Sequence, residues 1–381
     1  MYFRGYLSGG FFIIQVPLVT ADGLDQMVKS TDMHMNRNMD LSKFVPLTHQ
    51  AAGHPDLFES EDSALFAKLT NRKEIDFYTK LNSHVAEDKP LGSSLIDWVP
   101  QFMGVLTPGI SPDLKSQGAP VAAELEKKAS EQPNSEKEYV LLENLLFGFS
   151  QPSVLDIKLG VKLYDDDATD DKKERLGKVS DSTTSGSLGF RICGMDIRKT
   201  GKEVHEKWTD YVTTYQDADK IEYIKFDKWF GRALDEDTVL EGLDLFFHHN
   251  ELPEELRNII LSNTETRLQL LYNCLLEEEV RVISGSLLII FENDSARWKK
   301  KDNQDSLVFQ REIYDDDQDE EDQNDPDDEN LLRENCPLSK LALVDFAHST
   351  FVPGQKYDEN LVDGLESLLQ QISHLKDNEH R

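Results

Sequence analysis

The segment PSVLDIKLG, residues 152–160, decides the fold of this chain and the place of its chemistry. Successive side chains of an extended strand point to opposite faces of the sheet. The apolar face of this strand would carry Leu155, Ile157 and Leu159. Asp156 and Lys158 then project side by side from the other face. The spacing alone leaves two interpretations open: an ion pair exposed on an edge strand, or a catalytic pair on a strand whose back is buried.

A second carboxylate lies in another apolar strand, LALVDFAHS, residues 341–349. Asp345 in such a strand is costly unless it meets a cation, a hydrogen-bond donor or water. A divalent metal ion that holds nucleotide phosphates is one solution. An aspartate in open solvent at the end of the strand is the other.

Regular periodicity fills most of the chain after residue 43. Strands are predicted over 43–54, 63–70, 138–149, 188–197, 284–292 and 341–349, and helices over 72–83, 164–182, 238–249, 253–281 and 360–372. The inner faces of the first and last helices would carry Ile75, Tyr78 and Leu81, and Leu361, Leu365, Leu368 and Ile372. The run 138–149 reads as a buried strand that leads into a connector. A strand, a connector and then a larger set of elements is the layout of a two-lobed nucleotide-binding protein.

The charge of the chain excludes some partners. The net charge is −31 over 381 residues, and segment 315–329 holds 11 acidic side chains and no basic one. So acidic a protein is poorly suited to direct nucleic-acid binding, which needs Lys and Arg to displace counterions. A polyanionic substrate would have to be bound in a local basic pocket.

Cysteines and apolar runs limit the remaining classes. Cys193, Cys274 and Cys336 are far apart without CxxC spacing, which disfavours a zinc site and a disulfide framework and fits a reducing compartment. The apolar run 9–19 is about half as long as a bilayer span, so no transmembrane segment is expected. Arg4 ahead of this run leaves a signal peptide as an alternative to a flexible N-terminal extension.

Four blocks in order resemble the inositol polyphosphate kinase family. PSVLDIKLG matches the family's PxxxDxKxG signature, and it is followed by TTSGSLGFRICG (183–194), SGSLLIIFE (284–292) and VDFAHS (344–349). The resemblance spans about residues 48–373. Within the family the chain is most similar to the fungal multikinases. That similarity is carried by ENLLFGFSQPSVLDIKLG, FGRALDED (230–237), LLEEEVRVISGSLL (275–288) and the acidic tract before the last strand.

The resemblance implies a two-lobed α+β fold with antiparallel sheets and helices, distantly similar to protein kinases. The expected parts are an N-terminal extension over 1–40, an N-terminal lobe over 41–142 with a polar insertion at 111–137, and a C-terminal lobe over 143–373. The C-terminal lobe would include an inositol phosphate-binding segment at 162–182 and a disordered acidic insertion at 313–335.

The resemblance also implies roles for single residues. Lys68 matches the strand lysine that contacts ATP phosphates, and Glu143, Asn144 and Leu145 fall on the connector whose backbone meets adenine. Asp156 matches a residue that orients or deprotonates the attacking hydroxyl or contacts ribose, and Lys158 one that bridges substrate and γ-phosphate. Asp345 matches the metal-binding aspartate, and His348 a position that contacts the inositol phosphate. The implied cofactors are ATP and Mg²⁺.

Cations that follow the signature are candidates for binding the substrate phosphates. They are Lys162, Lys172, Arg175 and Lys178, with Lys173 beside them and Arg72 or Lys73 close after Lys68. On a helix, Lys172, Arg175 and Lys178 fall near one face. A surface helix neutralised by salt bridges is the alternative, because Asp165 to Asp171 lie just upstream.

The absence of GxxxxGK[ST], GxGxxG and HRD motifs disfavours P-loop kinases and conventional protein kinases. The segment between the signature and the TTSGSLGF block is shorter than in inositol trisphosphate 3-kinases, which implies an open pocket. The expected activity is phosphorylation of inositol tris- and tetrakisphosphates at the 3- and 6-hydroxyls. The alternatives are an inositol hexakisphosphate kinase, or a nuclear scaffold that docks transcription factors through the acidic tract. The expected location is nucleus and cytoplasm.

Overall fold

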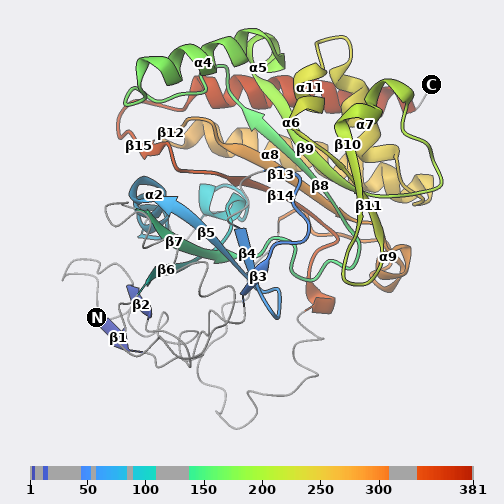
Figure 1. The fold of residues 1–381 in the computed structure, drawn as a ribbon, viewed down its shortest axis with the longest axis horizontal. Helices are drawn as coiled ribbons and strands as arrows, with labels where there is room; N and C mark the ends of the chain where they lie inside the picture. Colours follow the sequence, from blue (N-terminus) through green and yellow to red (C-terminus); the bar gives the residue numbers. More distant parts are fainter. Residues whose placement is uncertain are drawn as a thin grey trace.

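The computed structural model describes residues 2–4, 12–15, 44–52, 57–83, 89–108, 137–308 and 333–379. Two antiparallel sheets form two lobes, and the smaller lobe lies below the larger one in Figure 1. The predicted insertions at 111–137 and 313–335 fall almost wholly outside the described residues, as does most of the segment 1–40. None of the described helices combines the length and the apolar composition that a bilayer crossing requires.

The N-terminal lobe is built on a seven-stranded sheet in the order β1-β2-β6-β7-β5-β4-β3. Its strands are β1 (Tyr2–Arg4), β2 (Phe12–Gln15), β3 (Phe44–Pro46), β4 (Leu57–Ser60), β5 (Leu65–Asn71), β6 (Phe102–Pro108) and β7 (Lys137–Glu143). Helix α2 (Arg72–Ser83) follows β5 directly, and the short helix η2 (Leu95–Trp98) precedes β6. The predicted inner face of α2 is confirmed, because Ile75, Tyr78 and Leu81 are all buried.

The C-terminal lobe contains a six-stranded sheet in the order β10-β11-β9-β8-β13-β14. Its strands are β8 (Pro152–Leu159), β9 (Phe190–Arg198), β10 (Val212–Gln216), β11 (Glu222–Phe226), β13 (Ser286–Glu292) and β14 (Ser339–Val344), and β12 (Val280–Val282) pairs with β15 (Ser349–Phe351). The helices are α4 (Asp170–Asp181), α5 (Thr184–Leu188), η3 (Glu206–Tyr211), α6 (Lys228–Ala233), α7 (Val239–His248), α8 (Glu254–Glu277), α9 (Ser295–Lys300) and α11 (Glu359–Glu379).

The core of this lobe lies between the sheet and its helices. Helices α6, α7 and α11 contact β9, and α11 also contacts β8 and α8 (Figure 1). Leu155, Ile157 and Leu159 of β8 are each 0% exposed, which confirms the buried back of the signature strand. The predicted inner face of the last helix is likewise fully buried in α11. Because these helices cover one face of the sheet, the front of β8 is left for the contact with the smaller lobe.

Three sequence predictions are wrong in detail. The strand predicted over 43–54 ends at Pro46, and the chain beyond it packs on the larger sheet, where Ala51 contacts Val154 and Ile290. The helix predicted over 164–182 begins only at Asp170, where Thr169 caps it by accepting a hydrogen bond from the Lys172 N–H. The strand predicted over 341–349 is interrupted after Val344.

Candidate active site

The signature strand β8 is central, because it pairs with β13 on one side and β9 on the other. The interpretation of Asp156 and Lys158 as an exposed pair on an edge strand is therefore wrong. Asp156 is 8% exposed. The Lys158 side chain is 16% exposed, and its Nζ donates a hydrogen bond to the Ser284 carbonyl at 2.6 Å. Both side chains project from the front face of a strand whose back face is buried.

Asp156 is a carboxylate in a poorly solvated position. Burial raises its pKa from 3.8 to about 6, against the opposing effect of the Lys158 ammonium. Its Oδ1 atom is buried without a hydrogen bond of ordinary geometry, and the Ser286 hydroxyl opposes the rise in pKa only partly. A pKa near 6 is suitable for a group that accepts a proton at neutral pH.

Asp345 lies at the turn where β14 ends. Its φ of 69° is in the left-handed region, which a non-glycine residue adopts at a cost and which is common at functional sites. The turn brings its carboxylate 2.6 Å from Lys68 Nζ and 3.8 Å from Lys158 Nζ. The carboxylate is 42% exposed but is held between two cations, so it is not an aspartate in open solvent.

Lys68 on β5 is fixed by a residue that the sequence analysis missed. Its Nζ lies 3.0 Å from Oε1 of Glu74 on α2, whose side chain is almost fully buried. The same Glu74 oxygen accepts a hydrogen bond from the Phe346 N–H at 3.0 Å. Burial alone would lower the pKa of Lys68, but Asp345 and Glu74 raise it above its ordinary value, so the ammonium stays charged. The only sign of this role in the sequence is the position of Glu74, in the first turn of the helix that follows the strand of Lys68.

The connector after β7 carries the predicted adenine-binding residues. The backbone N–H groups of Glu143 and Asn144 donate to Gln101 and Ala64 carbonyls at 2.8 and 2.9 Å. The Leu145 N–H donates to no acceptor among the described residues, which leaves it available to a ligand. The Asn144 side chain is structural, because its amide donates to the Ser63 carbonyl at 2.8 Å and accepts from the Leu146 N–H at 3.0 Å.

Several predicted substrate residues come together beside this centre. His348 follows the Asp345 turn, and its Nε2 lies 3.4 Å from Lys172 Nζ on α4. Its other ring nitrogen, Nδ1, lies 2.7 Å from Oδ2 of Asp165. Lys73 of α2 reaches the same loop, 3.5 Å from Asp165 and 2.6 Å from Asp167. Two lysines and one histidine, from three separate segments, thus face one loop.

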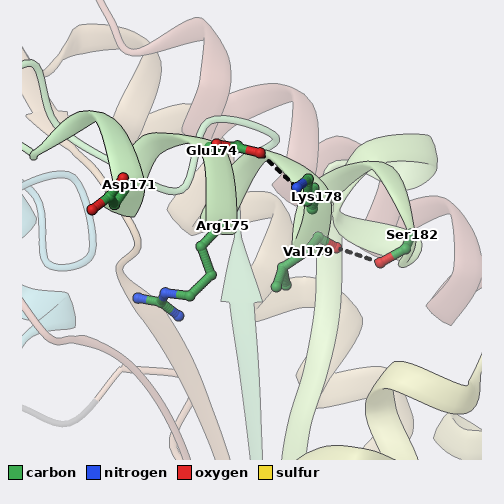
Figure 2. A pocket seen from close by; sticks show the side chains of 6 residues that line it. All are labelled: Asp171, Glu174, Arg175, Lys178, Val179 and Ser182. Atoms are coloured by element: carbon green, nitrogen blue, oxygen red, sulfur yellow. Dashed lines mark hydrogen bonds and ion pairs between the residues drawn. The ribbon is translucent and has the colours of Figure 1, made fainter.

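The other predicted cations lie apart from this cluster, and most of them pair with nearby carboxylates. Lys178 pairs with Glu174 one turn earlier on α4 at 2.6 Å, and Arg72 pairs with Asp76 at 2.9 Å. Lys162 pairs with Asp166 at 2.8 Å. Figure 2 shows the open hollow along α4, in which the Arg175 side chain extends away from the helix; no described carboxylate pairs with it. Lys178 therefore fits the alternative of a surface helix neutralised by salt bridges, whereas Lys172 and Arg175 remain candidates for binding phosphate.

The Asp345 carboxylate suits a metal ion that is shared with a nucleotide. Among the described residues no group of three or more His, Cys, Asp or Glu side chains is arranged to hold a metal ion. Mg²⁺ typically takes only one or two protein carboxylates, together with phosphate oxygens and waters. Asp345, partly exposed at its turn, fits that requirement.

Comparison with known proteins identifies the family. The family model described as "Inositol polyphosphate kinase" matches residues 139–373. The chain belongs to the inositol polyphosphate kinase family. Within this family it is 37% identical to the inositol polyphosphate multikinase of Saccharomyces cerevisiae over 354 residues, which cover 85% of this chain and 96% of the relative. It is 33% identical to the multikinase of Schizosaccharomyces pombe, over 65% of this chain and 78% of that one.

A solved structure of this kinase family confirms the α+β fold. It is the crystal structure of the Saccharomyces cerevisiae inositol phosphate multikinase in complex with ADP and Mn²⁺. The TM-score is 0.61 at 34% identity, and the match covers 82% of this chain and 98% of that one. The chain is therefore an inositol phosphate kinase, a phosphotransferase most similar to the multikinases.

Proposed function

We propose that this kinase transfers the γ-phosphoryl group of ATP to hydroxyls of inositol tris- and tetrakisphosphates, at the 3- and 6-positions. The observation that carries the proposal is the placement of Asp345 between Lys68 and Lys158, at 2.6 and 3.8 Å. Lys172 lies beside this centre, 3.4 Å from His348, and supplies positive charge that a polyphosphate requires. The multikinases named above, which this chain matches over most of its length, support the choice of substrate.

The nucleotide half is assembled from both lobes. Lys68 contacts the phosphates of ATP, while Glu74 holds the ammonium in place. The backbone of the connector contacts adenine, with the Leu145 N–H as its available donor. Asp345 would hold the Mg²⁺ ion, which would neutralise the charge of the phosphates. The ADP and Mn²⁺ bound to the yeast relative support both cofactors.

The transfer step needs a base and a cation. Asp156, with a pKa of about 6, accepts the proton of the attacking hydroxyl as its oxygen forms the new bond to the γ-phosphorus and the bond to the β-phosphate oxygen breaks. Lys158 lies two residues away on the same face and stabilises the charge on the transferring group. Its bond to the Ser284 carbonyl fixes the ammonium before substrate arrives.

Product analysis tests this proposal. The protein is incubated with ATP, Mg²⁺ and, separately, inositol trisphosphate, tetrakisphosphate or hexakisphosphate, and the products are resolved by ring position. Consumption of the tris- and tetrakisphosphates with new phosphates at positions 3 and 6 is expected. The Lys158→Ala variant should be inactive, whereas Lys299→Ala, an exposed lysine on α9, should match the wild type. Consumption of hexakisphosphate alone would show instead a kinase that makes pyrophosphates.

A further inference from the structure

Asp165 lies where three segments of the substrate half meet. It follows β8 in the chain, and its Oδ2 atom lies 2.7 Å from His348 Nδ1 and 3.5 Å from Lys73 Nζ. The other nitrogen of the same imidazole lies 3.4 Å from Lys172 Nζ. One carboxylate therefore contacts the segment after β14 and helix α2 directly, and helix α4 through the ring.

Burial separates Asp165 from its two neighbours. Its side chain is 16% exposed, whereas those of Asp166 and Asp167 are 94% and 78% exposed. Burial would raise the pKa of Asp165, but the hydrogen bond with His348 and the charge of Lys73 lower it below its ordinary value. The carboxylate is therefore ionised at neutral pH and is the fixed anion of the loop. Asp167 contacts Lys73 at 2.6 Å from an exposed position.

We propose that Asp165 is a positioning residue of the substrate-phosphate site, and that Asp167 is a counter-anion that a substrate phosphate replaces at Lys73. As the acceptor for Nδ1, Asp165 fixes the imidazole with Nε2 toward Lys172, which a free ring could reverse by turning about its Cβ–Cγ bond. Asp167 is itself an anion beside Lys73, so it competes with an incoming phosphate. The inference rests on the proposed function, because its ligand is the inositol phosphate.

The two aspartates should respond to substitution with opposite signs. Asp165→Ala should lower kcat/KM for inositol trisphosphate about tenfold, mostly through KM, because a charge-assisted hydrogen bond in a half-buried site is lost. KM for ATP should not change. Asp165→Asn can still accept a hydrogen bond from His348 Nδ1 and should therefore keep most of the wild-type kcat/KM. Asp167→Asn should lower KM for the trisphosphate about two- to fivefold, the range for an exposed ion pair.

The matched control is Asp210→Asn, which removes the same charge from an exposed position in η3 and should leave the kinetics unchanged. A double-mutant cycle isolates the positioning role, since Asp165→Ala should cost less than about twofold once His348 is already alanine. The same tenfold loss in both backgrounds would refute positioning, as would a wild-type KM in Asp165→Ala. A raised or unchanged KM in Asp167→Asn would refute the counter-anion role. This measurement tests that role even if Asp165→Ala does not fold. Wild-type protein without turnover would instead refute the proposed function.

Discussion

Replacing Asp156 with asparagine should make the protein more stable and nearly inactive at the same time. The carboxylate is 8% exposed, and one of its oxygens is buried without a hydrogen bond of ordinary geometry. The fold therefore holds a charge where it is poorly solvated. Such a position is favourable for a base but not for the native state. Asparagine keeps the shape and removes the charge.

The size of the gain follows from the pKa of Asp156. Its rise from 3.8 to about 6 means that ionised Asp156 costs the native state about 3 kcal/mol at pH 7.5. Because the native state binds the proton more tightly than the unfolded chain, wild-type stability falls as pH rises between these two values. At pH 4.5 the native carboxyl is protonated, so the advantage of asparagine shrinks to about 1 kcal/mol.

Thermal unfolding at the two pH values measures this difference. A chain of 381 residues has an unfolding entropy of about 0.8 kcal/mol/K, so Asp156→Asn should raise Tm by about 4 °C at pH 7.5 and by about 1 °C at pH 4.5. Phosphoryl transfer should fall about 10²- to 10⁴-fold, the usual contribution of a general base. Asp210→Asn, in η3, serves as the exposed control for both measurements. A lower Tm at pH 7.5, or an equal gain at both pH values, would show that burial does not set the state of Asp156.

Three further predictions concern the frame around the site. Glu74→Gln removes one of the two carboxylates at Lys68 and should raise KM for ATP about tenfold in steady-state kinetics, an effect that Asp76→Asn on the same helix should not reproduce. Glu292→Gln breaks the buried contact with Arg297 (2.6 Å) and weakens the bonds to the Ser150 and Gln151 N–H groups, so denaturant unfolding should show a loss of about 3 kcal/mol, absent in exposed Glu334→Gln. Gly194→Ala would place the new Cβ 2.2 Å from the Ala51 carbonyl and should lower the free energy of unfolding by about 1–3 kcal/mol. Gly177→Ala, in open space on α4, should raise it by about 0.5–1 kcal/mol. An unchanged stability in Gly194→Ala would contradict the close approach of residue 51 to the larger sheet.

Periodicity was sufficient wherever one face of an element is buried. The alternation in β8 predicts which side chains are buried, because a shift by one residue would expose three apolar side chains. The faces of α2 and α11 follow for the same reason. The strand predicted beyond Pro46 does not form, because His49 and Ala51 contact the other lobe instead of a neighbouring strand. Local pattern contains no information about a contact 147 residues away, such as the one between His49 Nδ1 and the Asp196 carboxylate at 3.4 Å.

The Asp345 turn shows the same limit at the site itself. An apolar run through residue 349 favours a continuous strand, and only tertiary contacts keep a non-glycine residue at a φ of 69°. The Phe346 N–H donates to Glu74, and the Phe346 ring stacks on Phe77 at 4.6 Å. Both partners lie on α2, more than 250 residues earlier in the chain. The bend that presents Asp345 is therefore a property of the assembled lobes.

Helix α2 connects the two halves of the site through two adjacent residues. Successive residues of an α-helix point about 100° apart, so Lys73 and Glu74 face different surroundings. Glu74 turns inward and fixes Lys68 and the Phe346 backbone, whereas Lys73 turns outward and reaches Asp165 and Asp167. A rotation of α2 that improved one set of contacts would strain the other. The orientation of this helix thus sets the nucleotide lysine and the substrate loop together, although neither residue belongs to the signature from which the site was predicted.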